Sequence, residues 1–140
     1  MIILDTNVLS EPMRSGANPA VAAWLDQQDI ETLYLTTVNL AELLLGVERL
    51  ARSRRRSTLE AKLSQIINLF AGSRILPFDA PAARLFAVLV ARASSAGHTI
   101  SFADGQIAAI AAAHGFSVAT RDAAPFIGVG VPVINPWELT

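Results

Sequence analysis

The segment MIILDTNVLS (residues 1–10) places three large apolar side chains directly before an aspartate, a threonine and an asparagine. The run Ile2–Leu4 contains β-branched residues and predicts a short buried strand. Asp5 ends that strand, and we consider two roles for it: a helix cap for the TNVL segment that follows, or one member of an acidic site. Acids at equivalent positions elsewhere in the chain would favour the second role.

The rest of the chain repeats this alternation of strand and helix. Strands are predicted at Leu33–Thr36, 74–78, 117–120 and within 131–136, and helices at 7–13, 19–28, 38–52, 57–70, 81–96 and 101–114. The alternation predicts a single α/β domain over residues 1–140, with a short parallel sheet of four to five strands flanked by helices on both faces. In such sheets ligands bind beyond the carboxyl ends of the strands, which is where Asp5 lies.

The composition narrows the class of protein. The 140 residues are 52 % hydrophobic, with a mean hydropathy of +0.43, which is ample for the core of one domain. The absence of cysteine excludes disulfides and thiolate metal sites. No apolar run reaches the roughly 18 residues that span a membrane, and the N-terminus lacks a basic leader, so we expect a cytoplasmic protein without a membrane anchor.

Three further acids occupy comparable positions. Glu42 lies in the helix segment TTVNLAELLLGVERL, whose apolar residues cover most of the circumference; we expect a largely buried helix, although a solvent-facing stripe would also explain this acid. Asp104 lies in SFADGQIAAIAAAHG, where it fits a capping pattern with Ser101, and Gly105 beside it leaves room for a ligand. Asp122 follows the fourth predicted strand, where a turn role is the alternative.

A parallel sheet would bring these four acids to one edge. At separations of about 6 Å and an effective dielectric near 20, each pair would repel by roughly 3 kcal/mol, and all pairs together by on the order of 15 kcal/mol. That sum is comparable with the whole stability of a domain, so the cluster must bind protons or divalent cations. Ligands that are all oxygen favour Mg²⁺ or Mn²⁺ over Zn²⁺, and carboxylates around Mg²⁺ suit phosphodiester hydrolysis by a metal-activated water.

The segments LDTNVLSE, AELLLGV, FADGQIAAIA and ATRDAAPF resemble the four acidic motifs of PIN-domain ribonucleases. They are most similar to the VapC-type toxins of type II toxin–antitoxin modules, and ILPFD and VINPWEL resemble the FitB-like branch of that group. The resemblance covers essentially the whole chain. It implies a single PIN-like domain and a Mg²⁺- or Mn²⁺-dependent endoribonuclease.

The resemblance also implies the roles of individual residues. Asp5 and Asp104 would bind the metal directly, and Glu42 and Asp122 would complete the catalytic set, partly through waters. The polar residues in supporting positions are Thr6, Asn7 and Thr120. In one departure from the pattern, many relatives carry TRN and a further acid three residues on, whereas here Asp122 takes the place of the asparagine and Pro125 that of the later acid. The role of the fourth acid is therefore open.

The partners that the resemblance implies are an RNA substrate, a second copy of the chain in a homodimer, and a small cognate antitoxin. The antitoxin would insert a segment near the acids, inhibit the enzyme and form a hetero-oligomer with it. Promoter DNA would be bound only through the antitoxin.

Alternative functions fit less well. A haloacid-dehalogenase-like phosphatase needs a second aspartate where this chain has Asn7, and a receiver-type switch needs a lysine at a strand end, whereas the only lysine, Lys62, lies in a predicted helix. A catalytically weak PIN-like binding protein, which acts mainly through an antitoxin–DNA complex, is the remaining alternative. The presence of all four acids argues against it.

Cations are concentrated in one region. Six of the eleven Lys and Arg residues lie between Arg49 and Lys62. A solvated helix end would explain them, and so would a surface that contacts RNA or the antitoxin. The candidates for such contacts are Arg49, Arg52, Arg54, Arg55 and Arg56.

Overall fold

Ile3 and Leu4 project to opposite faces of the first strand, and both are buried, so the sheet is covered on both sides. The computed structural model describes residues 1–139. Its strands are β1 (Ile2–Leu4), β2 (Leu33–Thr36), β3 (Ile75–Leu76), β4 (Ser117–Ala119) and β5 (Val133–Ile134). They form one sheet in the order β3-β2-β1-β4-β5, and every pairing is parallel. The predicted fold class is confirmed.

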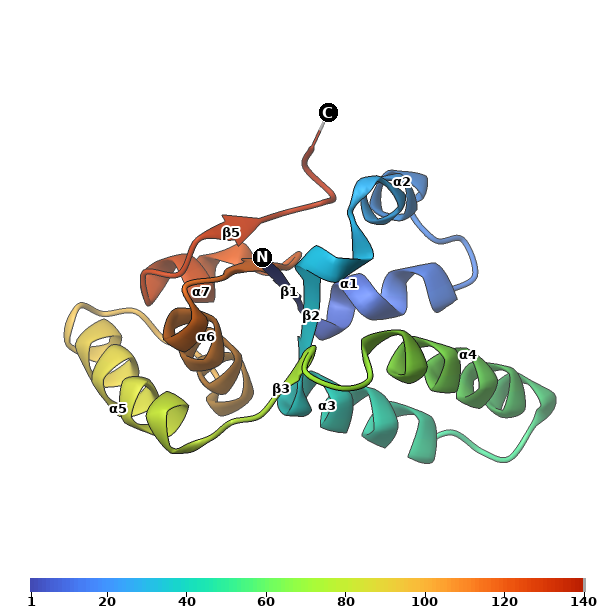
Figure 1. Cartoon of the computed structure of the whole chain (residues 1–140), viewed down its shortest axis with the longest axis horizontal. Helices are drawn as coiled ribbons and strands as arrows, with labels where there is room; N and C mark the ends of the chain where they lie inside the picture. The colour runs from blue at the N-terminus through green and yellow to red at the C-terminus, as the bar shows by residue number, and fades with distance from the viewer. Residues whose placement is uncertain (140) are drawn as a thin grey trace.

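The helices form two layers, one on each face of this sheet (Figure 1). The layer against Leu4 contains α1 (Thr6–Ser10), α2 (Pro19–Gln27), α3 (Thr37–Glu48) and α4 (Arg54–Phe70), with the short 3-10 turns η1 (Glu11–Met13) and η2 (Ile30–Thr32). The layer against Ile3 contains α5 (Ala80–Ser95), α6 (Phe102–His114) and α7 (Ala123–Gly128). None of the helices within residues 1–139 combines the length and the apolar character needed to cross a membrane.

Local signals explain where most helices begin and end. The side chain of Asn18 accepts a hydrogen bond from the backbone N–H of Ala20 and caps α2, and Gly115 ends α6 in the left-handed region at φ 69°. Helix α7 is not predicted from the sequence, and the predicted helix 7–13 is divided into α1 and η1. Two further helix boundaries are wrong by three or more residues. The hydroxyl of Ser53 caps α4 through the backbone N–H of Arg56, so α4 begins at residue 54 instead of 57, and α3 ends at residue 48 instead of 52.

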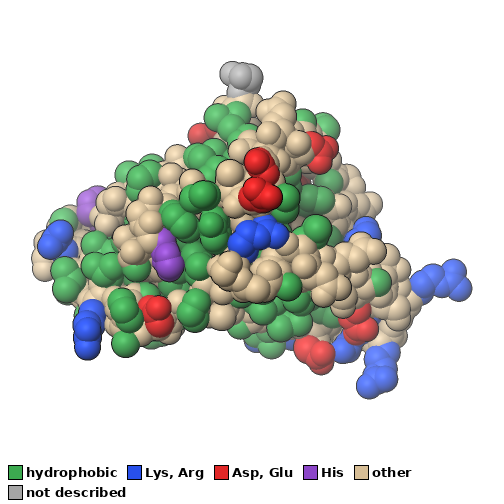
Figure 2. All heavy atoms as spheres, in the orientation of Figure 1, with side chains coloured by type: hydrophobic (Ala, Val, Ile, Leu, Met, Phe, Trp, Pro, Cys, Tyr) green, Lys and Arg blue, Asp and Glu red, His purple; other side chains and the backbone are tan. Residues whose placement is uncertain are grey.

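The surface is rich in apolar side chains. On the face seen in Figure 2, hydrophobic side chains are spread widely, and Lys and Arg side chains stand mostly toward its two ends. The large apolar residues that are most exposed in the described part of the chain include Leu44, Leu45, Leu69, Val88, Phe102 and Ile127. This surface follows from a composition in which more than half of the residues are hydrophobic.

Candidate active site

Asp5 is the first residue after β1 and is 5 % exposed. Its Oδ1 atom accepts a hydrogen bond from the backbone N–H of Thr6 at 2.8 Å, which caps α1. Its Oδ2 atom accepts a hydrogen bond from the hydroxyl of Thr120 at 2.8 Å and a longer one from the amide of Asn7 at 3.4 Å. Asp5 therefore caps a helix and also lines the acidic cavity described below, so the two roles considered for it coexist.

Asn39, a buried residue that is not among the predicted site residues, also holds Asp5 in place. Asn39 donates from Nδ2 to Oδ1 of Asp5 at 3.3 Å and to the hydroxyl of Thr6 at 3.3 Å. Its Oδ1 atom accepts hydrogen bonds from the N–H and the hydroxyl of Thr36, and its own backbone N–H donates to that hydroxyl. These contacts form a capping box at the start of α3. The T-x-x-N spacing of TTVN is the sequence signal that identifies this residue.

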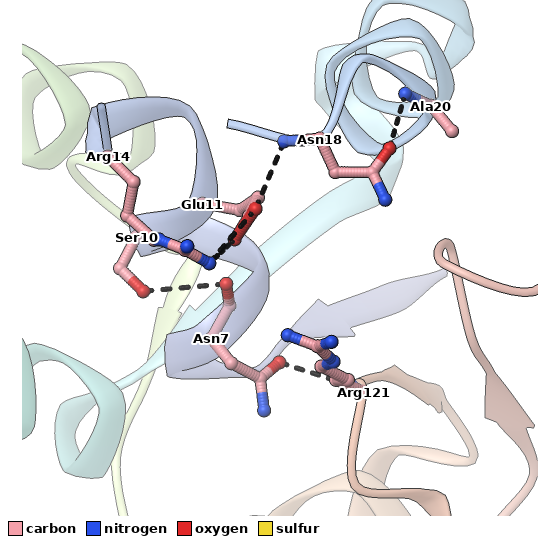
Figure 3. Close-up of polar contacts among 7 residues, drawn as sticks. All are labelled: Asn7, Ser10, Glu11, Arg14, Asn18, Ala20 and Arg121. Carbon is pink, nitrogen blue, oxygen red and sulfur yellow. Dashed lines mark hydrogen bonds and ion pairs between the residues drawn. The ribbon is translucent and has the colours of Figure 1, made fainter. Parts of the chain in front are cut away.

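The loop after β4 is tied to α1 by the predicted supporting residues. Thr120 is buried, and its hydroxyl accepts a hydrogen bond from the backbone N–H of Asp122 at 3.1 Å. The side-chain oxygen of Asn7 accepts one from the backbone N–H of Arg121 at 3.2 Å (Figure 3). These contacts bring Thr6, Asn7 and Thr120 together around one carboxylate, although Thr120 is distant from the other two in the sequence.

Glu42 lies in the second turn of α3, and its Oε1 atom accepts a hydrogen bond from the hydroxyl of Thr6 at 3.0 Å. The expectation that this helix is largely buried is wrong. Only Asn39 and Leu43 of α3 are buried, Glu42 is exposed, and Leu44 is 44 % exposed. The reason is that α3 packs against α1, α4, α6 and β2, which leaves its remaining circumference uncovered by residues 1–139.

Asp104 is half-buried in the first turn of α6, and its backbone N–H donates to the hydroxyl of Ser101, which caps the helix as predicted. Asp122 is exposed at the start of α7 and makes no capping hydrogen bond with its side chain. The space beside Gly105 is not left for a ligand. A Cβ atom at that position would lie 2.7 Å from the ring of Phe86, so the glycine permits close packing of α6 against α5.

All four predicted acids line one cavity of about 310 Å³, together with Thr6, Asn7 and Ser10. None of the three ion pairs found within residues 1–139 involves these acids. In the same residues, no three Asp, Glu or His side chains stand close enough together to form a ready-made cation site. The acids thus line one cavity without a basic partner, and their side chains would have to move inward to coordinate a single ion.

Burial is the main cause that raises the pKa of Asp5 from 3.8 to about 6, against the opposing hydrogen bond from Thr120, and the charges of Asp104 and Glu42 raise it further. Burial likewise raises the pKa of Asp104, and the charge of Asp122 adds to that effect. For two of the four carboxyl groups, Asp5 and Asp104, ionisation is therefore less favourable than for an ordinary aspartate. A bound cation would reverse this preference.

The donor set fits a hard divalent cation. Every side chain that lines the cavity offers oxygen, from carboxylates, hydroxyls and the amide of Asn7, and none offers sulfur or imidazole. Mg²⁺ and Mn²⁺ prefer such ligands, whereas Zn²⁺ sites commonly use cysteine and histidine.

One member of the arginine run has a structural role. Arg56 contacts Glu60 at 2.7 Å and Glu48 at 3.2 Å, and it also donates to the backbone oxygen of Leu50. Its side chain is 17 % exposed. The exposed members of the run are Arg49, Arg52, Arg54 and Arg55. A solvated helix end and a surface that contacts RNA or the antitoxin therefore remain the two interpretations for those four residues, and not for Arg56.

A parallel α/β sheet with four acids around a cavity at its carboxyl edge is the arrangement expected of a PIN domain, and the family described as "PIN domain" matches residues 2–130. The chain is 48 % identical over 139 residues to "VapC ribonuclease Y4jK" of Sinorhizobium fredii and 48 % identical over 139 residues to "Toxin FitB" of Neisseria gonorrhoeae, with 99 % of both chains covered in each case.

A solved structure, "FitAB bound to IR36 DNA fragment", has a TM-score of 0.96 and 46 % identity, and the match covers 100 % of this chain and 98 % of that one. The chain therefore belongs to the PIN-domain family, in its VapC-type, FitB-like branch.

Proposed function

We propose that this protein is a divalent-metal-dependent endoribonuclease and the toxin of a type II toxin–antitoxin module. The observation that carries the proposal is the cavity of about 310 Å³ that Asp5, Glu42, Asp104 and Asp122 line without a basic partner in the described part of the chain. The relatives named VapC ribonuclease and toxin FitB, which match almost the full length of the chain, support the same conclusion.

Each acid has a distinct part in this proposal. Asp5 and Asp104 would hold Mg²⁺ or Mn²⁺ directly, and Glu42 and Asp122 would complete the shell in part through water. When bound, the ion would supply a water of lowered pKa and neutralise charge on the scissile phosphate. The chain's own contribution is orientation: the Thr120 hydroxyl binds Asp5 at 2.8 Å and thereby restricts the rotation of its carboxylate.

The same cavity would serve as the inhibitory site. A cognate antitoxin that inserts an arginine or lysine between the acids would form charge-assisted hydrogen bonds there and exclude the metal. The solved relative described as FitAB bound to a DNA fragment supports a partner through which promoter DNA is contacted. The exposed apolar residues of α3 and α5, such as Leu44 and Val88, support a homodimer or an antitoxin interface.

The test is cleavage of total bacterial RNA by purified, antitoxin-free protein in Mg²⁺, in Mn²⁺ and in EDTA. We expect discrete cuts that require the metal and disappear in Asp5→Asn and Asp104→Asn. The matched control is Asp26→Asn, which changes an exposed acid on α2 and should leave the cuts unchanged. Cuts that persist in both site variants would show a contaminating nuclease and contradict the proposal.

A second function has one observation in its favour. Because no three acidic or histidine side chains in residues 1–139 converge into a ready-made cation site, the chain could act as a catalytically weak binding protein within an antitoxin–DNA complex. Isothermal titration with Mn²⁺ separates the two functions. Absence of Mn²⁺ binding together with absence of RNA cleavage under any metal condition would favour the binding protein.

A further inference from the structure

A groove of about 240 Å³ leads away from the acidic cavity, between α1, α3 and α4. The groove and the cavity share Thr6, Ser10 and Glu42, so they form one continuous depression. Apolar side chains such as Met13 and Leu59 line the groove. The acidic site therefore extends on this side into a surface of different chemistry.

The charge along this depression changes sign. Arg14 and Arg55 line the groove, and a second pocket of about 530 Å³ continues from it through Arg55 to Arg54 and Lys62. Within residues 1–139, Arg54, Arg55 and Lys62 form no ion pair, because the three ion pairs there use only Arg14 and Arg56 as cations. The far end of the depression thus holds a surplus of positive charge.

Arg14 is held in place by a buried acid that the proposed chemistry does not use. Glu11 is 4 % exposed, and its carboxylate contacts Nη1 of Arg14 at 3.0 and 3.3 Å and accepts a hydrogen bond from the backbone N–H of Asn18 at 3.1 Å (Figure 3). The Arg14 side chain itself is 57 % exposed. Its Nε and Nη2 atoms have no hydrogen-bond partner in the part of the chain that the structure describes, so they are free to bind a ligand.

We propose that this depression is the path of the RNA strand on one side of the scissile phosphate, an inference that rests on the proposed ribonuclease function. Arg14 and Arg55 contact phosphates beside the acidic cavity, and Arg54 and Lys62 contact phosphates further along. The apolar groove between them receives the face of a base. Glu11 is a positioning residue that fixes Arg14 in advance.

The charges favour a nucleic acid over a protein as the occupant. Three unpaired cations beyond the acidic cavity match the regular negative charge of a phosphate backbone, which provides most of the affinity of non-specific nucleic-acid binding. Arg56, which belongs to the same run, faces Glu48 and Glu60 instead and is not part of the path. The path thus assigns a function to two members of the run and excludes a third.

The experiment measures KM and kcat of Mg²⁺-dependent RNA cleavage between about 50 and 200 mM salt. We expect Arg55→Gln and Lys62→Gln to raise KM more than they lower kcat, and each to reduce the slope of log KM against log salt concentration by about 0.7, the value for one lost contact with a single strand. Arg84→Gln, which removes an exposed cation on α5 in the opposite layer, is the matched control and should change neither quantity.

The outcomes are separable. A wild-type protein that cleaves no RNA with any metal overturns the proposed function. A wild-type protein that cleaves RNA, with Arg55→Gln and Lys62→Gln indistinguishable from Arg84→Gln, leaves that function intact and overturns the path. Variants that lose affinity for the antitoxin while KM and its salt slope stay unchanged also overturn it, because the groove then serves the protein partner. Trimming the RNA on one side of the cut, but not the other, should raise KM in the wild type.

Discussion

In the metal-free protein, Asp5→Asn should raise the free energy of unfolding relative to the wild type by more at neutral pH than at acid pH. Burial raises the pKa of Asp5 from 3.8 to about 6, so the folded protein retains a proton that the unfolded chain has lost. The stabilisation by protonated Asp5 is complete below pH 3.8 and is lost as the pH rises through about 6. The difference between the two pKa values corresponds to about 3 kcal/mol.

The assay is urea unfolding in EDTA of wild type and Asp5→Asn from about pH 4 to pH 8, where the wild type is expected to lose this stabilisation. The free energy of unfolding of the variant minus that of the wild type should increase by about 2.5 kcal/mol across this range, because the rest of the effect lies below pH 4 and all other groups titrate in both proteins. Mg²⁺ at pH 8 should stabilise the wild type more than the variant. If the difference in free energy of unfolding between variant and wild type is the same at pH 4 and at pH 8, the reasoning is refuted. Asp5 would then have the same pKa in the folded and in the unfolded protein.

Three other substitutions test the packing around the site. Thr120→Val removes the hydroxyl that donates to Asp5, so we expect a loss of about 1–3 kcal/mol in urea unfolding and a higher pKa of Asp5; unchanged stability would contradict this. Asn39→Ala removes the capping box of α3 and should cost about 1–3 kcal/mol, with a shortened helix detectable by hydrogen exchange at residues 37–40. Gly105→Ala places a Cβ atom against Phe86 and should cost about 1–3 kcal/mol, of which a second substitution, Phe86→Leu, should restore part.

Local chemistry accounts for what the sequence predicts well. Ile2–Leu4 and Leu33–Thr36 are predicted to the residue because each is a short apolar run that ends at a polar helix cap. The location of Asp5 and Asp122 at one edge follows from the parallel sheet, since the carboxyl ends of parallel strands coincide, whereas Asp104 reaches the same cavity because of how α6 packs after α5.

What escapes sequence analysis depends on contacts between distant segments. The burial of α3 cannot be predicted from its apolar circumference, because the number of neighbours decides how much of that circumference is covered. The space beside Gly105 depends on Phe86, which belongs to a different helix. The contact between Asn39 and Asp5 joins residues 34 positions apart, so the TTVN pattern predicts the cap of α3 but not its second function.

The four acids differ in a way that determines how the site responds to its ligands. Glu42 and Asp122 are exposed, whereas Asp5 is buried among four hydrogen-bond donors and still has a raised pKa. A proton, a divalent cation and a basic antitoxin side chain would therefore compete for the same buried carboxylate. Without a bound cation, Asp5 is mostly protonated below about pH 6, so both metal binding and any antitoxin contact with Asp5 should weaken there together. A contact between the antitoxin and the groove alone would keep its affinity over the same range, because no Asp5 charge is involved in it.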